Sequence, residues 1–325
     1  MTIIQALKKH NNDYSYIENC FVNKVGCQLR SISSFPVDIG LSVSVIIPAY
    51  KSNNTIKFVL SSLKRQTFLK KGGELEIIIV DDASPTPLLP EILKFKKFLK
   101  IRYIRKSKTE GAGKARDEAI LLAGNDLLIF IDSDIVLPED FISNHVFVHS
   151  NLIKKSILLS FRENVSIKDR RLRDKESWKN ARLDHGDHRN KIVFLKDWVT
   201  CPSEKRLVGK KFNILKDSDY FKKFKANEKI CLWNLPMMIL TCAVSVRRKL
   251  IKKKFKVPQE LKGWGFNDTC LFAPVVAVGA FVIPLLNSNV LHIIDSLHTK
   301  INSVKNLEYK RNEKIYFRYI KETEL

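Results

Sequence analysis

The stretch LLIFIDSDIVLPED (residues 127–140) joins five apolar residues to two aspartates that are two positions apart. Short apolar runs that stop at polar turn residues are typical of buried strands in parallel sheets. We therefore expect a strand over residues 127–131 that ends at Asp132, Ser133 and Asp134. In an open α/β sheet, ligands bind beyond the carboxyl ends of the strands, so this aspartate pair lies where a binding site is expected.

The residues before this stretch repeat the same pattern. Apolar runs at residues 43–47, 76–80 and 101–104 predict three more strands, and amphipathic segments at residues 54–66 and 114–123 predict helices. This alternation is typical of βαβ units. It predicts an α/β fold with a Rossmann-like, mostly parallel central sheet flanked by helices.

The chain is strongly basic. Its 325 residues include 57 Lys and Arg against 34 Asp and Glu, which gives a formal net charge of +23, and 45% of the residues are hydrophobic. That apolar content is sufficient for a sizeable core and argues against a disordered chain. The charge predicts an anionic partner: a nucleic acid, a nucleotide substrate, an acidic glycan or an anionic membrane surface.

Cysteine spacing and hydropathy predict a cytoplasmic protein. The six cysteines form no C-x-x-C pair, and the N-terminal residues lack the continuous apolar run of a signal peptide. The longest uncharged apolar run, residues 271–286, is shorter than the ~20 residues that a membrane-spanning helix needs. We expect a buried helix followed by a strand there. Peripheral contact with the inner face of an anionic membrane stays open.

Asp132 and Asp134 are the strongest candidates for chemistry. Two carboxylates at a strand end offer the oxygen ligands that Mg²⁺ and Mn²⁺ prefer, and a bound diphosphate would complete the coordination. The alternative is structural, because acidic turns after strands also cap the helix that follows.

Two further segments are candidates for ligand contacts. Asp81 and Asp82, with Ser84, either accept hydrogen bonds from a ribose or base, or stabilise a turn before Pro85. Arg116 follows small residues at a predicted helix start, where it either faces a phosphate or belongs to a solvated basic surface. The chain has no G-x-G-x-x-G after the first strand and no P-loop motif, which argues against dehydrogenases and P-loop NTPases.

Four motifs now appear together in residues 41–145. They are VSVIIPAYKSNNTIKFVLSSLKRQTF, EIIIVDDASPT, EGAGKARDEAI and LLIFIDSDIVLPEDFI. In order and spacing they resemble the nucleotide-binding half of family 2 glycosyltransferases of GT-A fold. The resemblance implies a nucleotide-sugar donor, usually a UDP-sugar, and an Mn²⁺ or Mg²⁺ ion.

The resemblance also implies residue roles. Asp82 would read the uracil, Asp132 would lie near the ribose with Ser133, and Asp134 would ligate the metal. Arg116 matches the arginine of the family's G-x-x-x-A-R-N stretch, in which Asp117 replaces the asparagine. The nucleotide pocket would be lined by Pro48, Ala49 and Tyr50.

The segment GWGFND (residues 263–268) is similar to the W-G-G-E-D stretch of galactosyltransferase and N-acetylgalactosaminyltransferase relatives. By this resemblance Asp268 is the base that deprotonates the acceptor, while Asn267 replaces a glutamate that binds sugar. His292 matches a metal-ligating histidine of these relatives, with a core histidine as the alternative. Trp264 is either a platform for a sugar ring or a core residue.

One base and an in-line attack favour single displacement with inversion. The expected enzyme moves a hexose or N-acetylhexosamine from a UDP-sugar to a glycan, a lipid-linked sugar or a peptide. UDP-Gal, UDP-GalNAc, UDP-GlcNAc and UDP-Glc stay open as donors. The alternatives are a nucleic-acid-binding protein, for which no typical motif is present, and a non-catalytic protein of GT-A fold.

The expected organisation has four parts. An N-terminal extension (1–40) precedes the nucleotide-sugar-binding half (41–145), the acceptor-binding and catalytic half (146–295) and a tail (296–325). The basic and aromatic end of this tail either touches a membrane or packs on the core.

Charge without periodicity at residues 164–229 predicts a partly mobile insertion in the second half. Inside it, the segment 178–198 holds His185, Asp187 and His188 at no spacing typical of a metal site. We expect a charged loop there that closes over the donor.

Overall fold

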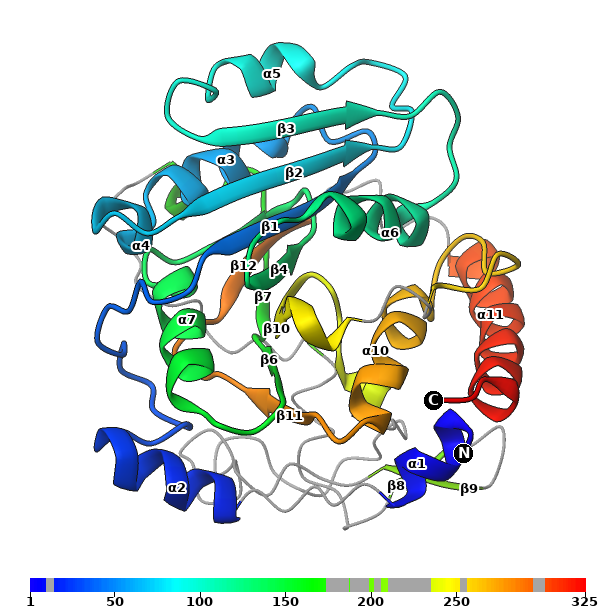
Figure 1. Cartoon of the computed structure of the whole chain (residues 1–325). Helices are drawn as coiled ribbons and strands as arrows, with labels where there is room; N and C mark the ends of the chain where they lie inside the picture. The colour runs from blue at the N-terminus through cyan, green and yellow to red at the C-terminus, as the bar shows by residue number, and fades with distance from the viewer. Residues whose placement is uncertain are drawn as a thin grey trace.

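The computed structural model describes residues 1–9, 15–173, 187, 199–201, 206–209, 235–251, 256–294 and 302–325. Its centre is a seven-stranded sheet in the order β11-β6-β10-β4-β1-β2-β3 (Figure 1). Strand β10 pairs antiparallel with β4 and with β6, and the other pairs are parallel. The seven strands are β1 (Val43–Ala49), β2 (Leu75–Asp81), β3 (Lys100–Arg105), β4 (Leu127–Ile131), β6 (Ser156–Leu159), β10 (Ala243–Arg247) and β11 (Phe281–Pro284). The mostly parallel α/β fold is confirmed.

Two smaller sheets accompany the central one. The first has the order β5-β12-β7, and the second pairs β8 with β9. Their strands are β5 (Ile135–Val136), β7 (Arg162–Ser166), β8 (Val199–Cys201), β9 (Arg206–Gly209) and β12 (Val290–Ile294). Strand β12 lies between β5 and β7, so it brings the segment after β4 next to residues of the second half.

Helices cover both faces of the central sheet. The α-helices are α1 (Ile3–Lys9), α2 (Ser15–Val25), α3 (Ile56–Lys64), α4 (Thr67–Lys70), α5 (Leu89–Leu93), α6 (Ala112–Leu122), α7 (Phe141–Asn151), α10 (Asn267–Ala277) and α11 (Asn302–Glu322). Short 3₁₀ helices are η1 (Arg170–Leu172), η3 (Leu235–Met238) and η4 (Arg248–Leu250). Both predicted halves contribute strands to the one sheet.

The strand pattern decides which helices pack on which face. Because side chains alternate along a strand, Val43, Val45 and Ile47 of β1 join one hydrophobic cluster with α3, while Ile46 joins another with α6. All of these strand residues are fully buried. The predicted strands and helices of residues 43–131 lie within two or three residues of the observed ones, and residues 271–286 form most of α10 followed by β11 as expected.

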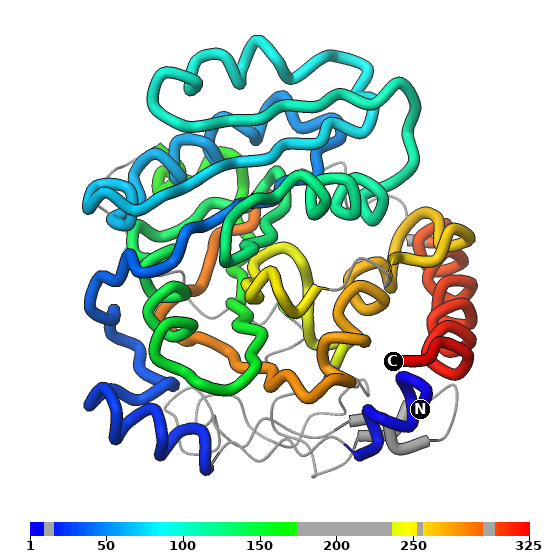
Figure 2. The backbone as a smooth tube through the Cα atoms, viewed as in Figure 1, coloured from blue at the N-terminus to red at the C-terminus, as the bar shows by residue number. Residues whose placement is uncertain are grey.

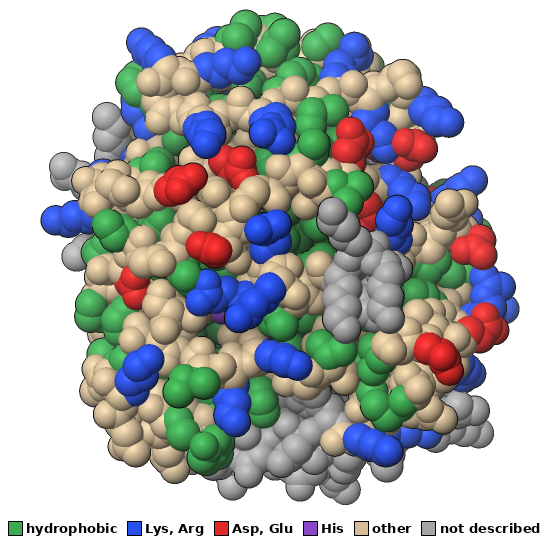
Figure 3. Space-filling view, in the orientation of Figure 1, with side chains coloured by type: hydrophobic (Ala, Val, Ile, Leu, Met, Phe, Trp, Pro, Cys, Tyr) green, Lys and Arg blue, Asp and Glu red, His purple; other side chains and the backbone are tan. Residues whose placement is uncertain are grey.

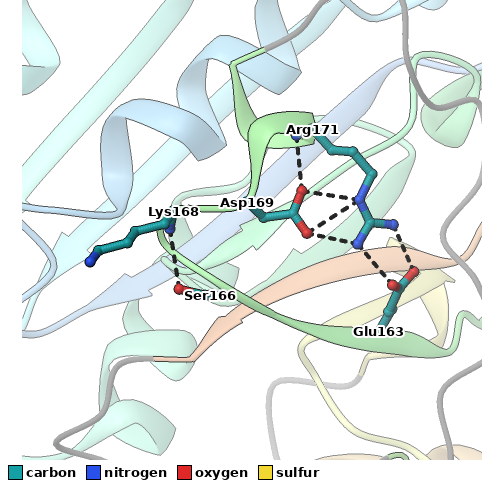
Figure 4. A network of polar contacts seen from close by, with 5 residues as sticks. All are labelled: Glu163, Ser166, Lys168, Asp169 and Arg171. Carbon is teal, nitrogen blue, oxygen red and sulfur yellow. Dashed lines mark hydrogen bonds and ion pairs between the residues drawn. The ribbon is translucent and has the colours of Figure 1, made fainter.

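Residues 164–173 form regular structure, although the sequence pattern predicted that a mobile insertion begins at residue 164. Asn164 lies in β7, and the turn after β7 is held by Arg171, which donates to both Glu163 and Asp169 (Figure 4). The hydrogen bonds that it donates to Asp169 and to Glu163 raise the pKa of the Arg171 guanidinium. Ion pairs between neighbouring side chains therefore stabilise this turn, which has no periodic pattern of apolar residues.

The segment 178–198, with His185 and His188, lies outside the described residues. Asp187 is described by itself. It is buried, and its carboxylate accepts a hydrogen bond from the backbone N–H of Arg162.

The two ends of the described chain lie side by side (Figure 2). Thr2 and Glu324 form a β-bridge, and the N–H of Ile3 donates to the carbonyl of Thr323 at 3.0 Å. On α11, Tyr316 and Phe317 are buried in the core cluster. Of the two roles left open for the tail, the structure therefore shows packing on the core.

Across the described ranges, no helix combines the length and the hydropathy that crossing a bilayer would need.

Candidate active site at the carboxyl edge of the sheet

A pocket of about 400 Å³ opens where β1, β2 and β4 end. It brings together most of the site residues that the sequence predicts, including residues from both halves of the chain. These residues are Pro48, Ala49, Tyr50, Asp82, Arg116, Asp132, Ser133, Asp134, Trp264, Asn267 and Asp268.

Arg116 lies at the centre of the polar network. Its Nη2 donates to Oδ1 of Asp132 at 2.7 Å and its Nη1 donates to Oδ1 of Asp268 at 3.0 Å. Burial alone would lower the pKa of this guanidinium, but Asp268 and Asp132 outweigh burial and raise the pKa. Burial raises the pKa of Asp132, although Arg116 opposes it, and the neighbouring Asp134 and Asp268 carboxylates raise it further. Arg116 thus holds together two carboxylates that would otherwise repel each other.

Asp268 is oriented by a residue that the sequence analysis missed. The Thr241 hydroxyl donates to Oδ1 of Asp268 at 2.7 Å, and the Thr241 N–H donates to Oδ2 at 3.2 Å. Thr241 lies two residues before the start of β10 and is fully buried. With Arg116, these donors fix the carboxylate at the first turn of α10.

Asp134 and His292 face each other across β5 and β12. Nε2 of His292 lies 3.5 Å from Oδ2 of Asp134, and Nδ1 lies 2.8 Å from Oδ1 of Asn164, its partner residue on β7. An amide oxygen can only accept, so the ring donates from Nδ1. With Nδ1 engaged in this way, Nε2 is the ring atom that faces the aspartate.

This arrangement fits a divalent cation. Oδ1 of Asp134 is buried and has no hydrogen-bond partner. Asp132, Asp134 and Asp268 line the pocket with three carboxylates, against the guanidinium groups of Arg116 and Arg162. Within the described ranges, no three Asp, Glu, His or Cys side chains cluster as a ready-made metal site. Two protein ligands completed by a substrate diphosphate are a common arrangement for Mg²⁺.

Asp81 and Asp82 differ in their positions. Asp82 lines the pocket, and its two oxygens accept from the N–H groups of Glu110 and Gly111 at 2.9 and 2.7 Å. Asp81 lies outside the pocket lining and is fully buried. Its carboxylate accepts hydrogen bonds from the Tyr103 hydroxyl at 2.7 Å and from the N–H of Ser84 at 2.9 Å. For Asp81 the structure shows the turn-stabilising role and no direct contact with the pocket.

Helix α11 holds the loop that precedes α10. Nδ2 of the buried Asn312 lies 3.0 to 3.1 Å from the carbonyls of Lys262, Trp264 and Gly265. Gly265 has φ +95°, a conformation that side chains rarely adopt, and a Cβ there would lie 3.0 Å from the Tyr309 ring. Trp264 is half-exposed and lines the pocket, so it is not a core residue.

The lining residues that were not predicted include an arginine and a tyrosine. Arg162 on β7 contributes a guanidinium whose Nε is buried without a hydrogen-bond partner, and Tyr309 on α11 packs against Trp264 with ring centroids 5.7 Å apart. The sequence around Arg162 carries no motif. Tyr309 lies in a segment whose only signal was its mixture of basic and aromatic residues.

Asp117 follows Arg116 on α6, and burial of its carboxyl group disfavours the ionised form. Burial raises the pKa of its carboxyl to about 6, and its Oδ2 is buried without a hydrogen-bond partner. The folded state therefore binds the proton more tightly than the unfolded state, and the free energy of unfolding falls as the pH rises from about 4 to about 6.

Asp117→Asn should consequently increase the free energy of unfolding at neutral pH by roughly 1 to 3 kcal/mol. It should also flatten the decline between about pH 4 and pH 6. Urea unfolding of both proteins across this range measures the effect. An equally steep decline in the variant would show that another group is responsible.

Residues 44–252 match the family described as Glycosyl transferase family 2. The chain belongs to this family. The match covers β1 to β10 and so includes Arg116, both aspartates of the Asp132–Asp134 segment, and Thr241.

Two curated members are similar over short segments. Poly(ribitol-phosphate) beta-N-acetylglucosaminyltransferase TarS of Staphylococcus aureus is 31% identical over 121 residues, which are 35% of this chain and 20% of TarS. UDP-Glc:alpha-D-GlcNAc-diphosphoundecaprenol beta-1,3-glucosyltransferase WfgD of Escherichia coli is 30% identical over 92 residues, 28% of this chain and 34% of WfgD. The chain thus matches about a third or less of either relative's length.

Solved structures of the family's fold cover most of the chain. The complex of S. aureus TarS residues 1–349 with UDP-GlcNAc gives a TM-score of 0.56 at 18% identity, over 87% of this chain and 68% of that one. Mannosyltransferase PcManGT of Pyrobaculum calidifontis, with GDP-Man and Mn²⁺, gives 0.54 at 13% identity, over 99% and 74%. At these identities the similarity shows the GT-A fold.

Proposed function

We propose that this protein is a metal-dependent, inverting glycosyltransferase that moves a hexose or N-acetylhexosamine from a UDP-sugar to a hydroxyl of its acceptor. One observation carries the proposal: Arg116 joins Asp132, at the nucleotide side of the pocket, to Asp268, at the start of α10. The donor-binding and acceptor-activating carboxylates predicted by the family resemblance therefore share one cavity.

The donor would lie along the ends of β1, β2 and β4. Pro48, Ala49 and Tyr50 would line the nucleotide, with Tyr50 46% exposed beside Lys51, whose Nζ lies 5.1 Å from the ring centre. Asp82 would accept a hydrogen bond from the uracil edge while keeping its bonds to the 110–111 loop, because a carboxylate accepts several donors. Asp132 and Ser133 would contact the ribose.

Asp134 and His292 would hold Mn²⁺ or Mg²⁺. The unpartnered Oδ1 of Asp134 and the Nε2 lone pair of His292 are the donor atoms, and Asn164 would orient the imidazole. A divalent ion there offsets negative charge on the leaving diphosphate.

Asp268 would take the proton of the acceptor hydroxyl. Hydrogen bonds from Thr241 and Arg116 fix the position of its carboxylate in the pocket. Asn267 stands where the W-G-G-E-D stretch has a glutamate. It would not take part in proton transfer, because an amide is not a base at neutral pH. Trp264 would support a sugar ring on its exposed indole face. Attack from the Asp268 side, opposite the diphosphate, inverts the anomeric centre.

The acceptor is proposed to be a glycan or a lipid-linked sugar. The relatives' names specify poly(ribitol-phosphate) for TarS and a diphosphoundecaprenol-linked sugar for WfgD, and no observation supports a peptide. A cytoplasmic location stays a prediction.

A donor screen tests the proposal. Thermal unfolding should be measured with Mn²⁺ and each of UDP, UDP-Gal, UDP-GalNAc, UDP-GlcNAc and UDP-Glc. A ligand at about a hundred times its Kd adds about 2.7 kcal/mol to the free energy of unfolding. We expect one UDP-sugar to raise the melting temperature more than UDP, and to be hydrolysed slowly.

The controls separate the alternatives. GDP-mannose with Mn²⁺ should have a smaller effect than UDP. Stabilisation without hydrolysis or transfer for every donor would indicate a non-catalytic GT-A protein, and no stabilisation by any nucleotide would contradict the proposed function altogether.

A further inference from the structure

A second cavity, of about 570 Å³, lies at the opposite edge of the central sheet. Strand β10 connects the two: Ala243 pairs with Ile131 at the active-site end, and Arg247 pairs with Leu127 at the other end. Five residues of strand separate these ends by about 14 Å. The second cavity is thus distinct from the proposed active site, and we call it the basic cavity.

Four cationic side chains surround the basic cavity. Lys154 and Lys155 come from the loop between α7 and β6, and Arg247 and Lys249 come from the end of β10 and from η4. None of the described residues that line it is acidic, and no carboxylate in the described part of the chain forms an ion pair with any of the four. In Figure 3, Lys and Arg side chains lie over the lower centre of the visible face, near α7 and β10, with few acidic ones between them.

An apolar tip lies beside these cations. Ile153 is 89% exposed, more than any other large apolar residue that the structure describes. Next to it, Nζ of Lys154 lies 5.4 Å from the centre of the Tyr16 ring on α2, and Tyr16 is 61% exposed. Burial of an aliphatic chain and of an aromatic ring would be favourable at an interface that is apolar inside and polar outside.

We propose that this surface docks the protein on a bilayer that contains anionic phospholipid. A phosphate headgroup would enter the basic cavity between Arg247 and Lys249. Ile153 and Tyr16 would enter the boundary between headgroups and acyl chains, while Lys154 and Lys155 would stay at headgroup level. A free phosphate or an acidic polymer would use the cations but would leave the exposed apolar tip without a role.

Docking in this way has a consequence for orientation. The active-site pocket opens at the opposite edge of the sheet, so it would face away from the membrane, an orientation that favours a glycan acceptor over a sugar linked to a lipid of the same bilayer. The inference does not depend on the proposed transferase activity, because vesicle binding is measured without donor or acceptor.

Co-sedimentation with vesicles tests the inference. The protein should pellet with phosphatidylcholine vesicles containing about one-third phosphatidylglycerol, and not with pure phosphatidylcholine, at about 0.1 M salt. Removing two charges with Arg247→Gln and Lys249→Gln should weaken binding about 25-fold, since each basic residue near an anionic surface contributes about fivefold. Ile153→Ser, which keeps the charge, should weaken it about tenfold.

The matched control is Lys96→Gln with Lys100→Gln, which removes two exposed charges at a distant edge near β3. This variant should bind vesicles within about twofold of the unchanged protein, because its lysines lie outside the docking surface. Equal losses in the two double variants would overturn the proposal, since general basicity would then explain binding. Unchanged binding in Ile153→Ser, with full competition by inorganic phosphate, would overturn the bilayer assignment. Melting curves confirm that each variant folds.

Discussion

Asp268→Asn should lower the turnover rate about a thousandfold, within the range that general-base catalysis contributes. The amide keeps the size of the side chain and can still accept from Arg116 and from Thr241, but it cannot take a proton. Affinity for UDP in the presence of Mn²⁺ should change by less than about threefold, because the lost function is realised only in the transition state. Transfer kinetics together with calorimetry separate the two quantities.

The matched control for this variant is Asp117→Asn. It makes the same carboxylate-to-amide change on α6, one residue from Arg116 but outside the pocket lining. Its turnover should equal that of the unchanged protein. If Asp268→Asn retained more than about a tenth of the activity, Asp268 would not be the base.

Asp134→Asn should reduce Mn²⁺-dependent UDP affinity about a hundredfold or more, since it removes the negative charge of one of the two protein ligands of the proposed metal site. UDP binding measured without metal should stay unchanged. Asn164→Ala should give a smaller loss, about tenfold, because this residue would affect the metal through the orientation of His292. Titration of UDP in the presence and absence of Mn²⁺ gives both numbers.

Asp126→Asn is the comparison for the metal site. Asp126 directly precedes β4, at the opposite end of the strand from Asp134, and bonds to Ser42. The Asp126→Asn variant should bind UDP as tightly as the unchanged protein, both with and without Mn²⁺. If Asp134→Asn and the unchanged protein bound UDP equally well in the presence of Mn²⁺, Asp134 would not be a metal ligand.

Local patterns predicted the nucleotide side of this protein well. A buried strand must be apolar, and a parallel strand must end in a turn, so β1, β2 and β4 were readable from short stretches of sequence. The carboxylates at their ends then followed from the rule that ligands bind at this edge. Asp81 shows the limit of that rule, because two adjacent aspartates point to different surroundings and only Asp82 reaches the pocket.

The other half of the site depends on contacts between distant segments. Thr241 precedes a strand like many other residues, and only the antiparallel placement of β10 beside β4 brings it to Asp268. Arg162 is one of many basic residues, and the pairing of β7 with β12 sets its position. Ion pairs such as Arg171 with Glu163 order a stretch that has no apolar period. The periodicity of apolar residues indicates which face of a helix or strand is buried. It carries no information about contacts between segments that are distant in the sequence.

The three bonds from Asn312 have a consequence for protein synthesis. The loop that carries Trp264 and leads to Asp268 is held by a side chain 47 to 50 residues further along the chain. A ribosome that has delivered β1 to β10 has therefore supplied the nucleotide side of the pocket, yet the loop still lacks the helix that holds it. The strand ends that would contact the nucleotide are therefore synthesised well before the helix that holds this loop, so the two sides of the pocket are completed at different times.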